Sequence, residues 1–255
     1  MSGIRVVRDG AVGHVVLARP EKKNAIDQPM ACALVDAIHR FAADPAVRVL
    51  LLTADGADFC AGVDLAALAR LIDAPREAQQ ADVGALSAVI RTLRSIPQPV
   101  VAAVQGRAFA GGAGLATACD IVLAHSDATF AYPEVHVGFV PAMVLTLLRR
   151  AVGEKRAADL VLTGRTFGAE EACAMGLVSR VLPAATFAAE VEATTAVLAA
   201  ASPSALRLTK RLLYDLDGLA FTPALALGER VNIEARATAD FRAGVQRFVR
   251  PDGVR

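Results

Sequence analysis

The chain of 255 residues is long enough to form one large domain, or one domain with an appendage. Charged residues make up 21% of it and the formal net charge is +1, so it lacks the strong field that draws nucleic acid or an anionic membrane to a protein. The N-terminal residues show neither a secretory signal nor an apolar stretch long enough to cross a membrane, and we expect a cytoplasmic protein.

Four cysteines are widely separated in the sequence: Cys32, Cys60, Cys119 and Cys173. None forms a Cys-x-x-Cys pair, and no histidine stands at the spacing that zinc ligands use. We therefore expect buried free thiols and no metal.

The first fifty residues predict a hairpin, a helix and a strand. Residues 5–7 and 14–18 flank a turn and are typical of two paired strands. Asp27 is a typical N-cap for a helix that we expect to end near Phe41. The apolar run at 47–53 is short, as expected of a strand that is covered on both faces.

A polar segment then separates two predicted helices. A loop over residues 54–64 leads to a helix that begins at Leu65, and another helix is predicted over 83–95. The residues between them, 73–82, are expected to form either a mobile lid or a solvated linker.

The stretch from Val100 to Asp120 is the most informative. A β-branched strand leads through a turn at Gly106 into the glycine-rich run 110–114 and the start of a helix. Glycine lets backbone N–H groups approach a ligand closely, and a helix N-terminus supplies unpaired donors for an anionic oxygen. Glycines that only allow tight packing of the helix against the strand are the alternative.

Strands are also predicted at 121–124 and 129–132, so strands and helices alternate and indicate an α/β fold. From Pro141 onward the pattern predicts helices almost without exception, over residues 142–152, 154–162, 169–175, 185–201, 203–216, 223–239 and 241–249.

Two glycine-containing loops after two apolar strands are able to offer two N–H donors to one oxygen, which is how an oxyanion hole is built. Glu134 follows an apolar, aromatic run and is a candidate general acid or base, because apolar surroundings raise the pKa of a carboxyl group. The alternative for Glu134 is a glutamate at a helix start that interacts with the helix dipole.

Five segments together resemble the enoyl-CoA hydratase/isomerase, or crotonase, superfamily, in the order in which that family carries them. They are Arg19–Ala25, Phe59–Asp64, Val104–Asp120, Tyr132–Val135, and Leu162–Gly164 with Gly176–Val178. The resemblance spans nearly the whole chain. It implies a crotonase-like β/α spiral core over residues 1–200 and a C-terminal helical trimerisation region over 201–255.

The same resemblance implies an acyl-CoA thioester substrate, with coenzyme A as part of the substrate and no separate cofactor, and assembly as a homotrimer or homohexamer. It places the oxyanion-hole amides on Val63 and Gly111 and the acid/base role on Glu134. The further substrate-binding positions that it implies are Ala61, Gly62, Asp64, Gly112, Gly114, Tyr132 and Lys23.

Gly114 departs from the family pattern, because the two-glutamate hydratases carry their other catalytic glutamate there. A single base suits a double-bond shift, yet some family hydratases resemble this chain in having one glutamate. Hydration of a 2-enoyl-CoA, a reaction of fatty acid metabolism, is therefore the first hypothesis. A Δ3,Δ2-enoyl-CoA isomerase and a catalytically weak acyl-CoA-binding scaffold are the alternatives, and the length and branching of the acyl chain stay open.

Several cations are candidates for the CoA phosphates, because Ala66 stands where some relatives have a lysine. Lys22, Lys23 and Arg107 are such candidates, and solvated surface is the alternative for each. Lys210 and Arg211 are expected either to reach the CoA bound to a neighbouring subunit or to lie on a solvated helix face.

The remaining polar residues are given structural positions. His136 is expected on a helix surface and His125 at a strand end, while Asp64 and Asp120 are expected to be caps. Tyr132 is expected to pack near the acyl pocket, whose wall is predicted from Leu65 to Asp82.

Overall fold

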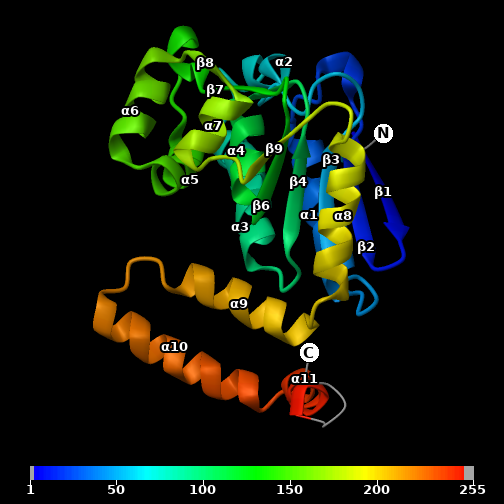
Figure 1. The fold of residues 1–255 in the computed structure, drawn as a ribbon. Coiled ribbons are helices and arrows are strands. Elements are labelled where there is room, and N and C mark those ends of the chain that lie inside the picture. Colours follow the sequence, from blue (N-terminus) through cyan, green and yellow to red (C-terminus); the bar gives the residue numbers. More distant parts are fainter. Residues whose placement is uncertain (1–2, 250–255) are drawn as a thin grey trace.

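A six-stranded sheet forms the centre of the protein, whose computed structural model describes residues 3–249 (Figure 1). Its strands, in spatial order, are β1 (Ile4–Asp9), β2 (Val12–Leu17), β3 (Val49–Ala54), β4 (Val100–Val104), β6 (Ile121–His125) and β9 (Arg180–Leu182). The pair β1 and β2 is an antiparallel hairpin, and every other neighbouring pair is parallel. Parallel strands are covered on both faces, which is why β3 and β4 are almost entirely apolar.

A smaller sheet stands beside the first. It contains β5 (Arg107–Phe109), β7 (Thr129–Ala131) and β8 (Thr166–Gly168), in that order. β5 and β7 are parallel, whereas β7 and β8 are antiparallel. Strand β5 of this sheet carries the chain from the end of β4 to the glycine-rich helix.

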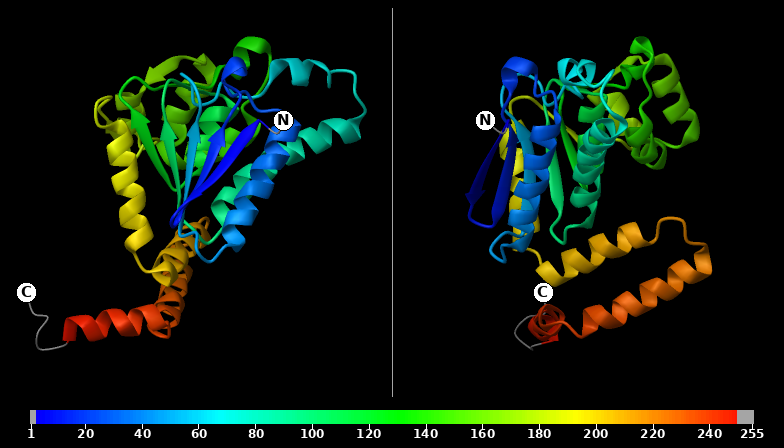
Figure 2. Two further views of the ribbon diagram at one scale, coloured as in Figure 1. Left: turned by 90° about the vertical axis from the view of Figure 1, so that its right-hand side faces the viewer. Right: turned by 180° about the vertical axis from the view of Figure 1, so that it is seen from behind.

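Helices cover the main sheet unequally on its two faces. One face packs against α1 (Gln28–Ala43), α3 (Arg76–Ser95) and α4 (Gly111–Ala118), and their side chains form the larger core cluster. The other face packs against α8 (Phe187–Ala200), which stands to the left of the strands in the left view of Figure 2, opposite α1 and α3. Strand residues alternate between the two cores: Leu50 and Leu52 face the first, and Val49 and Leu51 the second.

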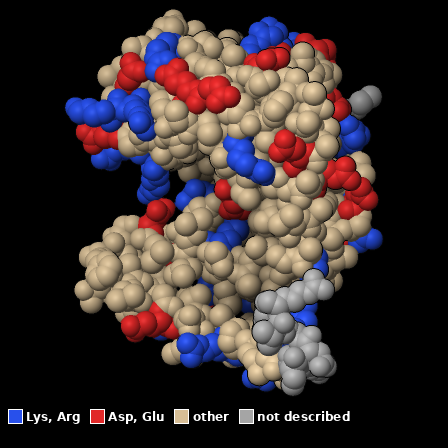
Figure 3. Space-filling model, viewed as in Figure 1, with Lys and Arg blue, Asp and Glu red and all other residues tan. Residues whose placement is uncertain are grey.

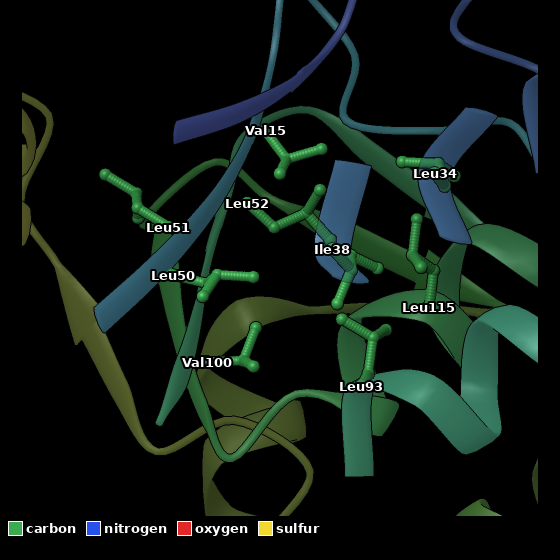
Figure 4. Close-up of a pocket in the computed structure, with 9 residues that line it drawn as sticks. All are labelled: Val15, Leu34, Ile38, Leu50, Leu51, Leu52, Leu93, Val100 and Leu115. Atoms are coloured by element: carbon green, nitrogen blue, oxygen red, sulfur yellow. The ribbon is translucent and has the colours of Figure 1, made fainter. Parts of the chain in front are cut away.

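A small gap in the larger core has an entirely apolar lining (Figure 4). Its volume is about 10 Å³, barely room for one water molecule, and it offers such a molecule no polar side chain. We interpret it as a packing gap between β3, β4 and the helices that cover them.

The shorter helices border the end of the molecule where the small sheet lies. They are η1 (Pro20–Lys22), α2 (Leu65–Ala69), η2 (Pro133–Val137), α5 (Ala142–Val152), α6 (Glu154–Thr163) and α7 (Ala169–Met175). No helix within residues 3–249 is both long enough and apolar enough to cross a membrane.

The C-terminal helices form a separate layer below the sheet in Figure 1: α9 (Pro203–Asp215), α10 (Phe221–Arg236) and α11 (Ala239–Val249). A hollow of about 650 Å³ lies between α3, α5 and α9, and Figure 3 shows it opening between this layer and the core. The layer leaves large apolar side chains exposed, with Phe221 82% and Ile233 68% accessible.

Most predicted elements are confirmed, and Asp27 caps α1 as expected by accepting a hydrogen bond from the amide of Met30. The expectation of a lid or linker over residues 73–82 is wrong for most of this segment, because α3 already begins at Arg76. The expectation that the chain is helical almost without exception after Pro141 missed two strands among the helices. Strands β8 and β9 interrupt them, each three residues long and therefore too short to show a sequence period.

The cysteines are only partly as predicted. Cys60 and Cys119 are buried free thiols, but Cys32 is exposed and Cys173 is half-buried. Burial raises the pKa of Cys60 to about 12, so this thiol stays protonated at neutral pH.

Candidate functional site

Two loops meet beside the N-terminus of α4. The loop after β3 is tied to β5, because Cys60 N–H donates to the Arg107 carbonyl and Phe109 N–H donates to the Cys60 carbonyl, both at 2.9 Å. On its other side the same loop pairs with Ile26, which receives the Asp64 N–H and donates to the Gly62 carbonyl. Strand-like pairing uses alternate residues, so the amide of Val63, between these two, faces the other way.

The second loop turns sharply into α4 at Ala110. This residue has φ +50° and ψ −121°, a backbone conformation that is rare for residues other than glycine. Its amide donates to the Ala131 carbonyl at 2.8 Å, and its carbonyl accepts the Gly114 amide at 3.0 Å. The turn leaves the amide of Gly111 as the first unpaired donor of the helix.

The amides of Val63 and Gly111 share one small space. A Cβ atom built on Gly111 would lie 3.8 Å from the Val63 nitrogen and 3.6 Å from its Cγ2 atom. Neither amide donates a hydrogen bond to any of residues 3–249. Two unpaired donors in one space are what an anionic oxygen needs.

The other glycines of the motif have packing roles. A Cβ on Gly112 would lie 2.2 Å from the Cys60 carbonyl oxygen, so α4 lies directly on the first loop. Gly62 has φ +104°, and a Cβ there would lie 2.9 Å from that of Ala110. The packing interpretation of the glycine cluster is therefore confirmed for Gly62 and Gly112, and the binding of an anionic oxygen at Gly111 stays a prediction.

Glu134 lies in η2, three residues after the carbonyl that binds Ala110. Its Oε2 atom is buried and has no hydrogen-bond partner in the described part of the chain. Burial raises the pKa of Glu134, and a hydrogen bond from its own backbone amide offsets this only in part. The carboxyl group is thus poised to exchange a proton closer to neutral pH than an exposed glutamate.

Gly114 faces α5. A Cβ atom built on it would lie 2.1 Å from Cγ1 of Val144, far inside van der Waals contact. Val144 is itself buried, so it fills the space in which a side chain at position 114 would begin. The sequence pattern gave no sign of this neighbour.

Tyr132 is completely buried, as its predicted packing role requires. Its ring stacks on Phe167 with centroids 6.4 Å apart, and burial raises the pKa of its hydroxyl. Tyr132 does not line the open cavity between α2, α3 and the segment after Glu134.

An open cavity of about 420 Å³ adjoins the site between α2, α3 and the segment after Glu134. Its lining is mostly apolar and consists of Leu65, Leu68, Ala69, Leu71, Ile72, Gln79, Asp82, Val83, Val137 and Phe139. The predicted wall from Leu65 to Asp82 is confirmed as a cavity wall, whereas the contributions of Val137 and Phe139 were missed. Leu86, one helical turn after the lining residue Val83, lies next to the amides, since its Cδ2 would lie 3.8 Å from a Cβ on Gly111.

The candidate phosphate ligands differ in availability. Lys22 and Lys23 are exposed, and Lys23 also shapes the site because its carbonyl accepts the Ala61 amide at 2.9 Å. Arg107 instead binds both carboxylate oxygens of Asp58 at 2.7 Å. Its charge is therefore already compensated.

Both expectations for Lys210 are wrong, whereas Arg211 lies on an exposed helix face, which is one of the two positions expected for it. Lys210 is 6% exposed and its ammonium group lies 2.8 Å from Asp120, so it faces neither solvent nor a neighbouring CoA. Arg211 forms an ion pair with Glu234 on the next helix.

Asp64 caps α2, as predicted, through the amides of Ala66 and Ala67. Its other oxygen binds Arg19 at 3.1 Å, so both carboxylate oxygens of Asp64 have partners within the chain. Asp120 is not a cap: it accepts hydrogen bonds from the Val100 amide and the Tyr214 hydroxyl, besides its pairing with Lys210.

The histidines lie where they were expected. His136 is exposed on η2, and its Nε2 atom is 2.9 Å from the Thr163 carbonyl, so the ring ties η2 to the end of α6. His125 ends β6 and packs edge-on against Phe187.

Comparison with known proteins gives the family and the fold of the chain. The Enoyl-CoA hydratase/isomerase family profile matches residues 8–251. The chain is 42% identical to the "Putative enoyl-CoA hydratase" of Thermus thermophilus over 95% of this chain and 96% of that protein. An enoyl-CoA hydratase crystal structure from Mycobacterium smegmatis has 30% identity and a TM-score of 0.91, covering 97% and 96% of the two chains.

Human enoyl Coenzyme A hydratase domain-containing protein 3 superposes with a TM-score of 0.93 at 28% identity, covering 97% of each chain. The crotonase-like α/β fold that the five segments predict is confirmed by these similarities.

Proposed function

Because the chain belongs to the enoyl-CoA hydratase/isomerase family, we propose that it is an enoyl-CoA hydratase that adds water to a 2-enoyl-CoA. One observation carries this proposal: the unpaired amides of Val63 and Gly111 share a space beside an apolar cavity, with the buried carboxyl oxygen of Glu134 in the adjoining segment. Adding water across the conjugated double bond places negative charge on the thioester oxygen, and donors aimed at that oxygen stabilise the transition state.

In this mechanism the thioester oxygen accepts hydrogen bonds from both amides. Glu134 takes a proton from water as the water oxygen bonds to the β-carbon, and the electron pair of the double bond moves to form the enolate. Glu134 then returns the proton to the α-carbon. One water molecule is added, the carboxylate is regenerated, and coenzyme A takes part only as a portion of the substrate. The raised pKa of Glu134 makes it a better base than an exposed carboxylate.

Isomerisation of a 3-enoyl-CoA to the 2-enoyl-CoA is the second candidate. It is favoured by the contact between position 114 and Val144, which leaves no room for a second carboxylate there. With Glu134 alone, a proton would leave the α-carbon, the enolate would form on the same amides, and the proton would return to the γ-carbon.

The two reactions are separated by assaying both substrates with the wild-type chain. Hydration removes the absorbance of the conjugated thioester, whereas isomerisation creates it. Turnover of the 3-enoyl-CoA alone would replace the hydratase by the isomerase. Tight binding of an acyl-CoA without turnover of either substrate would favour the catalytically weak scaffold.

The proposed role of Glu134 is tested by Glu134→Gln. Loss of a general acid/base group costs about 100-fold or more in kcat, and we expect a decrease of at least that size. Glu170→Gln, at an exposed position of α7, is the matched control and should leave kcat unchanged. A decrease below about tenfold with the fold intact would remove Glu134 from the mechanism.

The proposal extends to assembly as a homotrimer or homohexamer through the C-terminal helices. The exposed apolar side chains of α9 and α10, including Leu213, Phe221 and Ile233, support this. Light scattering on the purified chain tests it, and a monomer at micromolar concentration would contradict it.

A further inference from the structure

Asp82 interrupts an apolar row on α3. Gln79, Asp82, Val83 and Leu86 follow the spacing of one helix face, so they point to the same side of α3. Leu86 is the member next to Gly111, and the other three line the open cavity. The row therefore leads outward from the paired amides along the cavity wall.

The two polar residues of this wall differ in what they bind. The amide nitrogen of Gln79 donates to the carbonyls of Leu71 and Ala74, at 3.2 and 3.0 Å, and so closes the turn between α2 and α3. Asp82 is half-buried and makes no hydrogen bond or ion pair with any residue from 3 to 249. It is thus a carboxyl group with free hydrogen-bonding capacity in a wall that is otherwise apolar or already paired.

The surrounding charge is negative. Burial and the nearby carboxylate of Asp27 both raise the pKa of Asp82. Arg19 does not compensate this charge at Asp82, because its guanidinium binds Asp27 at 2.8 Å and Asp64 at 3.1 Å. An anionic group of a substrate at Asp82 would meet the carboxyl groups of Asp82 and Asp27. No Lys or Arg side chain is among the described residues that line the cavity.

We propose that Asp82 is a specificity residue, which favours acyl chains that carry a hydroxyl or amino group toward their far end and disfavours chains that end in a carboxylate. The inference rests on the proposed function, in that the cavity holds the acyl group. A donor on the substrate would supply the hydrogen bond that Asp82 lacks. A terminal carboxylate would add like-charge repulsion and lose its own hydration.

The length of α3 sets the reach of this effect. Four residues separate Leu86 from Asp82, a rise of about 6 Å along the helix. A chain whose thioester oxygen lies on the two amides must therefore extend well past its reacting carbons before its end meets Asp82. Short chains such as the butenoyl group are expected to be indifferent to this residue.

The test measures binding, so that it does not depend on turnover. The full-length chain is titrated by calorimetry with three saturated thioesters of equal length: hexanoyl-CoA, 6-hydroxyhexanoyl-CoA and adipoyl-CoA. We expect adipoyl-CoA to bind about tenfold more weakly than hexanoyl-CoA, and the hydroxylated chain to bind at least as tightly as hexanoyl-CoA. Asp82→Asn should remove most of the penalty on adipoyl-CoA while leaving hexanoyl-CoA within about twofold.

Glu77→Gln is the matched control, because Glu77 is an exposed acid in the first turn of the same helix and does not line the cavity. It should keep the wild-type ratios. Denaturant unfolding of each variant shows whether it is folded, and Asp82→Leu provides a second variant that lacks the carboxyl group.

Failure of the inference and failure of the proposed function give different results. If all three thioesters bind equally well, or if both Asp82 variants keep the penalty on adipoyl-CoA, the specificity role is wrong although the acyl-CoA site stands. If none of the thioesters binds, the proposed function is wrong and the inference falls with it.

Discussion

The first turn of α4 and the cavity wall made by α2 and α3 lie side by side but are built in opposite ways. The α4 turn is buried and consists of glycine and alanine, so it presents backbone atoms. The wall presents large side chains, and Leu65, Ile72 and Val83 are 64%, 72% and 52% exposed. The proposed chemistry thus depends on buried backbone atoms of the α4 turn. The proposed selection of substrate depends on exposed side chains that make few contacts with the rest of the protein.

This difference predicts how substitutions divide. Changes in the α4 turn should alter the fold or the rate of every substrate alike. Changes in the wall should alter the affinity for particular acyl groups and leave the reaction itself intact.

The largest effect is expected for Gly112→Ala. The added methyl group would lie 2.2 Å from the Cys60 carbonyl oxygen, a backbone atom that cannot move aside as a flexible side chain could. We expect a loss of about 3 kcal/mol in the free energy of unfolding, measured by urea denaturation. Gly84→Ala is the control, since it is also a helical glycine but has open space around it, and it should be neutral or slightly stabilising. Equal stability of the two variants would contradict the close packing at Cys60.

Gly111→Ala should separate folding from chemistry. Its methyl group meets nothing closer than 3.6 Å, so the urea midpoint should stay at the wild-type value. The same methyl group enters the space between the two amides, and we expect kcat/KM to fall about 100-fold, as for loss of an oxyanion donor. A folded variant with full activity would show that this space does not hold the thioester oxygen.

Phe139→Ala probes the wall. The ring is 48% exposed and lines the cavity, so its removal should cost little stability. We expect KM for a long-chain enoyl-CoA to rise about tenfold with kcat unchanged, because only apolar contact with the distal chain is lost. Butenoyl-CoA serves as the internal control. A fall in kcat for that short substrate would mean that wall and reacting centre are not independent.

The smallest effect concerns pH. Burial raises the pKa of Glu134 in the folded chain, so the folded state keeps this proton to a higher pH than the unfolded state does. The free energy of unfolding therefore falls as pH rises from the ordinary carboxyl range through the folded pKa, and the cost is complete above it. Glu134→Gln removes this cost, so its stability relative to wild type should be greater at about pH 7 than at about pH 4. The same difference at both pH values would argue against a raised pKa.

The parts of the site that the sequence predicts are local. The two glycine-containing loops and Glu134 after its apolar run can be picked out from short motifs, whereas the assignment of the amides to Val63 and Gly111 comes from the family resemblance. Asp27 and Asp64 are also predicted locally as caps, because a cap depends on residues two or three positions away.

The parts that sequence analysis missed depend on distant contacts. Val144 meets Gly114 from another helix, and Phe139 reaches the cavity from a segment about seventy residues after Leu65. The early start of α3 did have a signal: Pro75 is followed by residues that favour helix, and their polarity hid it. No local pattern distinguishes Lys210 from a solvated lysine, since its partners lie in elements formed about a hundred residues earlier.

The surroundings of Lys210 also bear on the order in which the chain can assemble. Its ammonium group donates to the carbonyls of Leu93 and Gln98 at 2.8 and 2.9 Å and pairs with Asp120. These acceptors come together only when the end of α3, the start of β4 and the start of β6 are in register. The C-terminal layer therefore packs on a surface that forms only when β4 and β6 are paired in the parallel sheet. A chain that ended before α9 would leave Asp120 without the ammonium group of Lys210. The last helices therefore complete the polar contacts of the core.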